Sequence, residues 1–193
     1  MKTYKETLFE GHTPKLHEKT YIADGARVVG DVTLGEYSSV WYNAVVRGDV
    51  NKIIIGRYVN VQDNAVIHVA DNYAATVGDF VTVGHSAVLH ACQVEDHCLI
   101  GMGSVVLDGA VIGRGSIVAA GAVVSPRTQV PPFSLIAGVP GRVVKQLPEN
   151  LDSTHAQAIK YKTLWCERYA IFPDNDGEKY HGETIVVSSR EEK

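Results

Sequence analysis

The sequence has few cysteines, no excess of positive charge and no long hydrophobic run. Its three cysteines, Cys92, Cys98 and Cys166, form no Cys-x-x-Cys motif, so no disulfide framework is expected. The formal net charge of -4 provides no attraction to nucleic acid or to anionic lipid. No apolar segment approaches the roughly 18 residues that span a bilayer, and residues 1–14 lack the apolar centre of a signal peptide. We therefore expect a cytoplasmic protein that binds neither nucleic acid nor membrane.

The sequence is comparatively rich in glycine, with 18 glycines against 7 prolines and 4 phenylalanines, and it carries an aliphatic repeat. Aliphatic side chains recur every six residues, with insertions after Val46 and Ile67. A small or slim residue, such as Ala44 or Val50, follows four places after nearly every one of them. The repeat positions are Ile22, Val28, Leu34, Val40, Val46, Ile55, Val61, Ile67, Val77, Val83, Leu89, Val94, Ile100, Val106, Ile112, Val118, Val124, Val130 and Ile136.

A period of six fits neither an amphipathic helix, which repeats every 3.6 residues, nor a half-buried strand, which repeats every two. It is similar to the hexapeptide repeat of left-handed β-helix proteins, in which three short strands form one triangular coil. The sequence therefore predicts an all-β fold, a left-handed parallel β-helix of roughly six coils. A β-sandwich with accidental periodicity is the alternative.

The repeat ends near Pro140, and the predicted organisation has three parts. Residues 1–147 form the β-helix domain, residues 148–172 contain a C-terminal α-helix that packs on it, and residues 173–193 form a polar tail. Asp152 or Ser153 is expected to cap the helix, which runs to about Tyr169. The tail shows no firm pattern, and we expect part of it to be disordered.

Repeat positions that are three apart lie on the same face in successive coils, so the repeat predicts spatial neighbours. Arg47, His68 and His90 each directly follow an aliphatic residue of one such column. The three side chains are therefore predicted to stack on one outward face. His68 and His90 lie one coil apart, which is close enough to bind one metal ion.

His85 is predicted to lie on a different face, because it follows Val83 by two places. Its neighbour in the preceding coil is Asp63, beside Gln62. If chains associate around a threefold axis, His85 of one chain meets His68 and His90 of the next. Three imidazoles with an open fourth position are typical of a catalytic zinc site.

Two segments resemble the gamma-class carbonic anhydrases and their close bacterial relatives. They are VVRGDVNKIIIGRYVNVQDNAVIHV at 45–69 and VGHSAVLHAC at 83–92. The resemblance implies a homotrimer with three interfacial metal sites, each with His68, His85 and His90 as ligands. It implies Zn²⁺ as the cofactor, with Fe²⁺ or Co²⁺ as alternatives.

The same resemblance assigns roles around the metal. Arg47 and Asp49 match the family's interface salt-bridge pair, and Arg47 is expected to anchor a carboxylate of the neighbouring chain, such as Asp63. These contacts would hold the ligands in register.

Three further residues match positions close to the chemistry. Gln62 is expected to orient a metal-bound hydroxide, Asn60 to hold substrate and Tyr161 to place a hydroxyl near the site. The implied reaction is hydration of carbon dioxide to bicarbonate, since a bound divalent cation lowers the pKa of its water to about 7. Leu107 and Met102, next in the columns of His90 and His85, would form an apolar lid.

The sequence departs from fuller members of the family at the glutamates that export protons. Val50 follows Asp49, and the insertion after His68 contains Asp71 as its only carboxylate. We therefore predict weak hydration, with Asp71 assisting proton release. Two alternatives remain: an acyl-CoA thioesterase or acyltransferase, which the same repeat family includes, and a metal-binding trimer with little or no turnover.

Overall fold

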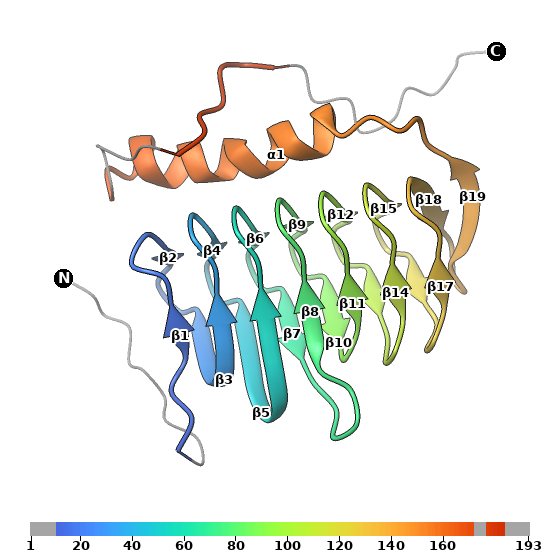
Figure 1. The fold of residues 1–193 in the computed structure, drawn as a ribbon, viewed down its shortest axis with the longest axis horizontal. Helices are drawn as coiled ribbons and strands as arrows, with labels where there is room; N and C mark the ends of the chain where they lie inside the picture. Colours follow the sequence, from blue (N-terminus) through green and yellow to red (C-terminus); the bar gives the residue numbers. More distant parts are fainter. Residues whose placement is uncertain (1–10, 172–176, 184–193) are drawn as a thin grey trace.

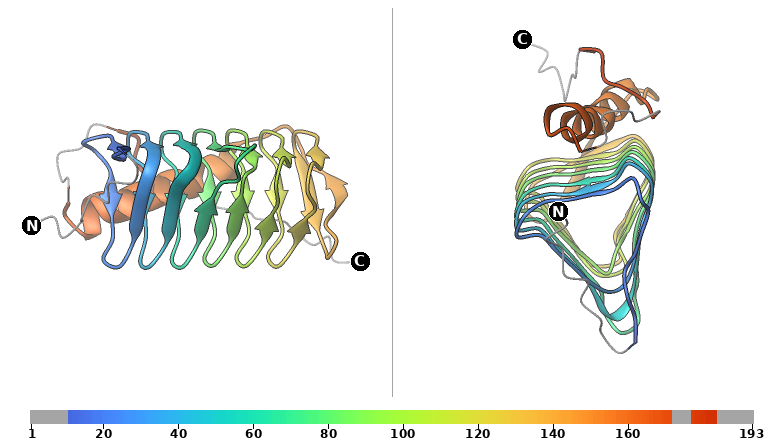
Figure 2. Two further views of the ribbon diagram at one scale, coloured as in Figure 1. Left: turned by 90° about the horizontal axis from the view of Figure 1, so that it is seen from below. Right: turned by 90° about the vertical axis from the view of Figure 1, so that its left-hand side faces the viewer.

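The computed structural model describes residues 11–171 and 177–183. These residues form a left-handed parallel β-helix of triangular cross-section with one helix along its side (Figures 1 and 2). The predicted fold class is confirmed. Within the described residues the coils number seven rather than six, because a strand one repeat before Ile22 places Leu16 against the core.

Each coil contributes a short strand to each of three faces, which we number in the order used below. The first face contains β3 (Arg27–Leu34), β5 (Val45–Ile55), β7 (Val66–His68), β10 (Val88–His90), β13 (Val105–Val106) and β16 (Val123–Val124). The second face contains β1 (Lys15–Leu16), the C-terminal parts of β3 and β5, β8 (Ala75–Val77), β11 (Gln93–Val94), β14 (Val111–Ile112) and β17 (Gln129–Val130). The third face contains β2 (Tyr21–Ile22), β4 (Ser39–Val40), β6 (Asn60–Val61), β9 (Thr82–Val83), β12 (Leu99–Ile100), β15 (Ile117–Val118) and β18 (Ser134–Ala137).

The aliphatic repeat forms the interior of the prism. All of the predicted positions belong to one core cluster, and all but Ile22 are buried. Glycine follows several of these positions because successive coils approach closely. A Cβ atom at Gly35 would stand 2.5 Å from the carbonyl oxygen of Gly56 in the next coil.

The insertion after Val46 corrects one position in the repeat. Val50 is 52% exposed on the extended strand β5, so it is not a corner residue as expected. Ile53 takes that place instead and is fully buried, in register with Val32 and Ala75. An insertion displaces the corner toward the following aliphatic residue, so the corner must be counted backward from Ile55.

The helix α1 (Asp152–Thr163) and the π-helical turn η1 (Leu164–Arg168) continue one another and lie along the third face, as Figure 2 shows. The predicted cap is wrong. Leu151 is the N-cap, and Asp152 is the first helical residue, with its N–H donating to the side chain of Asn150. Ile159 and Trp165 pack against a cluster of aromatic residues on the prism.

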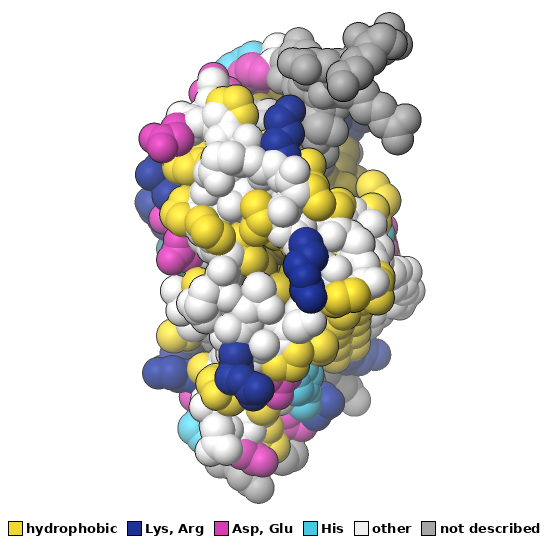
Figure 3. Space-filling model, turned by 90° about the vertical axis from the view of Figure 1, so that its right-hand side faces the viewer, with side chains coloured by type: hydrophobic (Ala, Val, Ile, Leu, Met, Phe, Trp, Pro, Cys, Tyr) yellow, Lys and Arg dark blue, Asp and Glu magenta, His cyan; other side chains and the backbone are white. Residues whose placement is uncertain are grey.

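One antiparallel strand lies at the C-terminal end of the prism. The strand β19 (Arg142–Gln146) pairs antiparallel with β18 and exposes Val143 and Val144. Figure 3 views this end and shows apolar and cationic side chains interspersed. None of the described helices is both long and apolar enough to cross a membrane.

The three-part domain division stays a prediction. Residues 173–176 and 184–193 of the expected polar tail, and the expected disorder there, lie outside the described residues. Residues 177–183 fold back onto the helix and the prism. There Tyr58 accepts a hydrogen bond from the N–H of Glu178, and the buried Lys162 donates one to its carbonyl.

Candidate metal centre

The predicted histidine column forms on the first face. Arg47, His68 and His90 lie in register on β5, β7 and β10, one coil apart. Each follows an inward-facing aliphatic residue, so the pleat turns all three side chains outward. The stacking that the repeat predicted is confirmed.

The two imidazoles of the column face each other. Nδ1 of His68 lies 3.2 Å from Nε2 of His90. The other nitrogen of each ring contacts a carboxylate: Nε2 of His68 lies 2.9 Å from Oδ1 of Asp49, and Nδ1 of His90 lies 2.6 Å from Oδ1 of Asp108. Carboxylates that accept a ring N–H fix the tautomer and orientation of metal-binding histidines.

This arrangement fits a divalent cation. When each neutral ring donates its N–H to a carboxylate, the facing nitrogens, 3.2 Å apart, both present lone pairs. Two nitrogens that bind one tetrahedral zinc ion at about 2.0–2.1 Å stand roughly 3.3–3.4 Å apart. The spacing of His68 and His90 is therefore close to that of two ligands of one ion.

His85 lies elsewhere, at the corner between the third and first faces. Its Nδ1 is 3.0 Å from Oδ2 of Asp63, while Oδ1 of the same carboxylate accepts a hydrogen bond from the backbone N–H of Tyr42. The side chain of His85 is 39% exposed. Within the described part of a single chain, no three His, Cys, Asp or Glu side chains are arranged to hold a metal ion.

Arg47 forms an ion pair within its own chain, with Asp49. The two side chains project from the same side of β5, two residues apart, which explains their contact. Burial acts to raise the pKa of Asp49, but hydrogen bonds from His68 and Arg47 outweigh it and hold the pKa below its usual value. The expected contact between Arg47 and a carboxylate of another chain stays a prediction.

Asn60 and Gln62 form a buried polar chain on β6 and just beyond it. Asn60 accepts a hydrogen bond from the Gln62 amide at 3.0 Å and donates one to the Thr82 hydroxyl at 2.9 Å. Asn60 is only 1% exposed. Both ends of its amide are therefore occupied by protein, which favours positioning of Gln62 over the expected direct contact with substrate.

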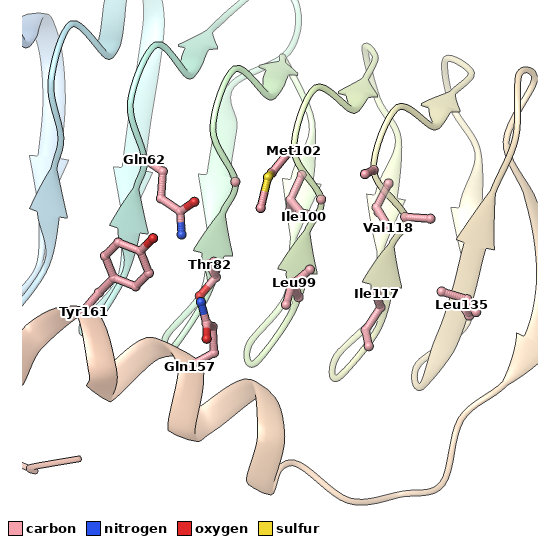
Figure 4. A pocket seen from close by; sticks show the side chains of 14 residues that line it. Gln62, Thr82, Leu99, Ile100, Met102, Ile117, Val118, Leu135, Gln157 and Tyr161 are labelled. Atoms are coloured by element: carbon pink, nitrogen blue, oxygen red, sulfur yellow. The ribbon is translucent and has the colours of Figure 1, made fainter. Parts of the chain in front are cut away.

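Gln62 and Tyr161 line one end of a pocket of about 410 Å³ between α1 and the third face (Figure 4). The Tyr161 ring also packs edge-on against Trp41, with ring centroids 5.3 Å apart. Burial, aided by the negative charge of Asp63, raises the pKa of Tyr161, so the phenol stays protonated at neutral pH. The structure thus places Gln62 and Tyr161 in the same pocket, and their expected roles at the metal stay predictions.

The sequence analysis did not identify Asp108 as a residue of this site. Leu107 was expected above His90, and the register does place it next in that column. The following residue, Asp108, nevertheless supplies the carboxylate that contacts His90. The repeat could have indicated Asp108, because it lies two places after the inward-facing Val106. Asp63 has the same spacing from Val61.

Asp71 lies on the exposed turn between β7 and β8. The side chain of Asn51 donates to the backbone carbonyls of Ala70 and Asp71, at 3.2 and 3.1 Å, and thereby fixes this turn. The proposed role of the Asp71 carboxylate in proton release stays a prediction.

Comparison with known proteins places this chain in a family. The family model for the bacterial transferase hexapeptide, which spans six repeats, matches residues 91–126. A Methanocaldococcus jannaschii protein named "Probable carbonic anhydrase" is 56% identical over 144 residues, which are 74% of this chain and 91% of that protein. "Gamma carbonic anhydrase 1, mitochondrial" of Arabidopsis thaliana is 43% identical over 158 residues, which are 78% of this chain and 58% of that protein.

The fold also matches a solved structure. The crystal structure of a hexapeptide transferase family protein from Anaplasma phagocytophilum shares 38% identity with a TM-score of 0.78. The match covers 82% of this chain and 96% of the other. The architecture is thus that of a hexapeptide-repeat β-helix, which carbonic anhydrases share with acyltransferases.

The chain belongs to the gamma carbonic anhydrase family. Membership implies a metal cofactor, and the facing nitrogens of His68 and His90 are compatible with one.

Proposed function

We propose that the protein catalyses the reversible hydration of carbon dioxide to bicarbonate with a metal ion held between two chains of a homotrimer. His68 and His90 of one chain and His85 of its neighbour would be the ligands. The observation that carries this proposal is the 3.2 Å separation of the facing nitrogens of His68 and His90, each ring backed by a carboxylate.

A bound divalent cation would lower the pKa of a coordinated water to about 7. Three imidazoles suit Zn²⁺, which we propose as the cofactor, although Fe²⁺ and Co²⁺ accept the same ligands. Metal content of protein purified without air distinguishes these ions.

The surrounding residues have separate tasks in this proposal. Asp49, Asp108 and Asp63 orient the three imidazoles, each through one ring nitrogen. Asn60 accepts a hydrogen bond from the Gln62 amide and thereby holds that amide in position. The amide of Gln62 then points toward the reacting oxygen.

The remaining features of the proposal concern the assembly and its location. Arg47 belongs to the column that would face the neighbouring chain, which supports a role in holding that contact together. Cys92, Cys98 and Cys166 are buried free thiols, which is compatible with the reducing cytoplasm. We therefore retain the cytoplasmic location as part of the proposal.

Mixing two inactive variants tests the shared site. His85→Ala and His90→Ala should each lose metal and hydration activity, measured by elemental analysis and stopped-flow spectroscopy. In trimers reassembled from equal amounts of both, about a quarter of the interfaces would pair an intact His68–His90 column with an intact His85. About a quarter of the wild-type metal and activity should therefore return.

The control is a mixture of His68→Ala with His90→Ala, which breaks the same column in every chain and should restore nothing. The assembly should have about three times the 20.9 kDa mass of one chain. A stable monomer, full activity in His90→Ala, or no recovery in properly mixed trimers would contradict the proposal.

Acyl chemistry is the second candidate, because the matched repeat is the bacterial transferase hexapeptide and the Anaplasma protein belongs to the hexapeptide transferase family. A thioester hydrolysis screen beside the hydration assay separates the two activities. Thioester turnover without hydration would favour this candidate. Loss of both activities alongside retained metal would favour a metal-binding trimer without turnover.

A further inference from the structure

The pocket beside Gln62 and Tyr161 continues along the third face as an apolar groove, which we call the helix groove. It begins beneath α1 and extends past the N-terminal end of that helix (Figure 4). Its far wall is formed by Leu99, Ile117 and Leu135 on β12, β15 and β18, one residue per coil. Figure 4 shows these side chains in a row that leads away from Gln62. The groove therefore extends well beyond the proposed metal centre.

The sequence explains why the groove is open here. On the third face, the residue directly after the inward aliphatic is Trp41 in an early coil, and its ring fills the space beneath the helix. The corresponding residues in later coils are Gly84, Gly101 and Ala119, which line the groove. Close approach of the next coil also demands the two glycines. The same small residues thus let successive coils approach closely and leave room for a ligand.

The polar groups of the groove gather at one end. Thr82 accepts a hydrogen bond from Asn60, so its own hydroxyl hydrogen remains to be donated. The Tyr161 hydroxyl and the amides of Gln62 and Gln157 border the same end. Among the residues that the structure describes, no charged side chain lines the groove. Because an unpaired charge is costly to bury, the lining favours an uncharged ligand.

The volume is large for the reaction proposed above. At about 410 Å³, the groove lies within the range of small-molecule sites. Liquid water takes about 30 Å³ per molecule, so there is room for on the order of ten non-hydrogen atoms. Carbon dioxide has three.

We propose that the helix groove binds an uncharged carbonyl compound with an unbranched apolar tail. Tyr161 and Thr82 donate hydrogen bonds to the carbonyl oxygen, and the tail lies along Leu99, Ile117 and Leu135. Binding requires no metal. Because Gln62 and Tyr161 border both sites, an occupied groove inhibits hydration if the proposed function holds.

A series of straight-chain primary amides tests the proposal: butanamide, hexanamide and octanamide. Binding to the full-length metal-loaded protein is measured by calorimetry. Affinity should rise about fourfold per added methylene until the groove is full, since each buried methylene contributes about 0.8 kcal/mol. Hexanoate should bind at least tenfold more weakly than hexanamide. Affinity that is independent of chain length, or equal affinity for hexanoate, would overturn the proposal.

Ile117→Trp fills the apolar part of the groove, away from Gln62 and Tyr161, and should weaken octanamide binding at least tenfold. Metal content and hydration should stay unchanged, because the polar end of the groove stays open. Val111→Trp is the matched control, because Val111 occupies the same repeat position on the second face. Leu135→Trp replaces the first variant if its circular dichroism spectrum shows loss of fold. Unchanged amide binding in a folded groove variant would overturn the proposal. Amide binding to metal-free protein separates this result from any failure of the hydration proposal.

Discussion

Two regions of the prism carry histidines that pack against another imidazole. The two regions differ in whether a carboxylate contacts the ring. At the first face, His68 and His90 each contact a carboxylate and turn the other nitrogen toward the same point. At the corner between the second and third faces, His97 stacks on Phe80, with ring centroids 4.8 Å apart. Its Nδ1 is buried without a hydrogen-bond partner among the described residues. The comparison shows that the second contact of each ring, rather than the repeat, distinguishes the proposed metal ligands His68 and His90 from the packing residue His97.

The aromatic corner is built from residues with unusual backbone geometry. Its members lie three places after the inward aliphatic and adopt positive φ, which is rare for bulky side chains. They are Tyr37, Tyr58, Phe80, His97 and Phe133, with φ between 54 and 58°. His97 Nε2 lies 3.3 Å from Nδ1 of His155 on α1, and His155 Nε2 lies 2.6 Å from Glu178. This corner holds the helix and the segment 177–183 on the prism.

The largest expected effect concerns the aromatic corner. Phe80→Ala should reduce the free energy of unfolding by about 3–5 kcal/mol, because the ring stacks on Tyr58, His97 and His155. Denaturant titration measures this change, and metal content should stay at the wild-type level. Phe133→Ala is the matched control at the same corner and, being less buried, should cost less. If Phe80→Ala removed the metal while leaving stability intact, the two regions would not be separate units.

On the first face, beside His68 and His90, Asp108→Asn should lower metal affinity about 10- to 100-fold. The reason is that the substitution weakens the contact that orients His90. Competition with a chelator measures the affinity, and stability of the metal-free protein should change little. Asp71→Asn serves as the control and should leave the affinity unchanged. In the same variant, the hydration rate at low buffer tests proton release, and an unchanged rate would exclude that role. Wild-type affinity in Asp108→Asn would show that the carboxylate does not support the ligand.

The smallest effect is a pH dependence that His97 contributes. Burial lowers its pKa, with further lowering by His155 and Arg114 that outweighs the opposite effect of Asp96 and Asp79. The unfolded chain therefore binds the proton more readily than the native state. The contribution to stability is full above the unfolded value of 6.5 and declines as the pH falls below it.

Thermal unfolding between pH 5 and 8 measures this dependence. His97→Phe, which keeps a ring on Phe80 but cannot titrate, should show a smaller loss of stability at low pH. The metal-free protein is used throughout, so that protonation of the proposed metal ligands does not contribute through metal release. An identical pH dependence in His97→Phe and wild type would exclude His97 as the titrating group.

Much of the fold could be predicted because the repeat directly encodes neighbours. Once Val46, Ile67 and Leu89 are recognised as one column, the register of Arg47, His68 and His90 follows without any tertiary information. Errors arose where the period breaks. Val50 was misplaced because the three-residue insertion extends β5 before the corner is reached at Ile53.

The sequence alone determined the prism, its columns and the separation of His85 from the other two histidines, since all three depend only on a six-residue period. The tertiary structure decided which carboxylate each imidazole contacts, and that His97 meets His155, which in turn contacts Glu178. It also decided that the helix leaves a groove over the later coils. The physical reason is that a period fixes the position of the backbone and the side to which a residue points. The choice of rotamer and the docking of distant segments depend on packing between surfaces that no local pattern specifies.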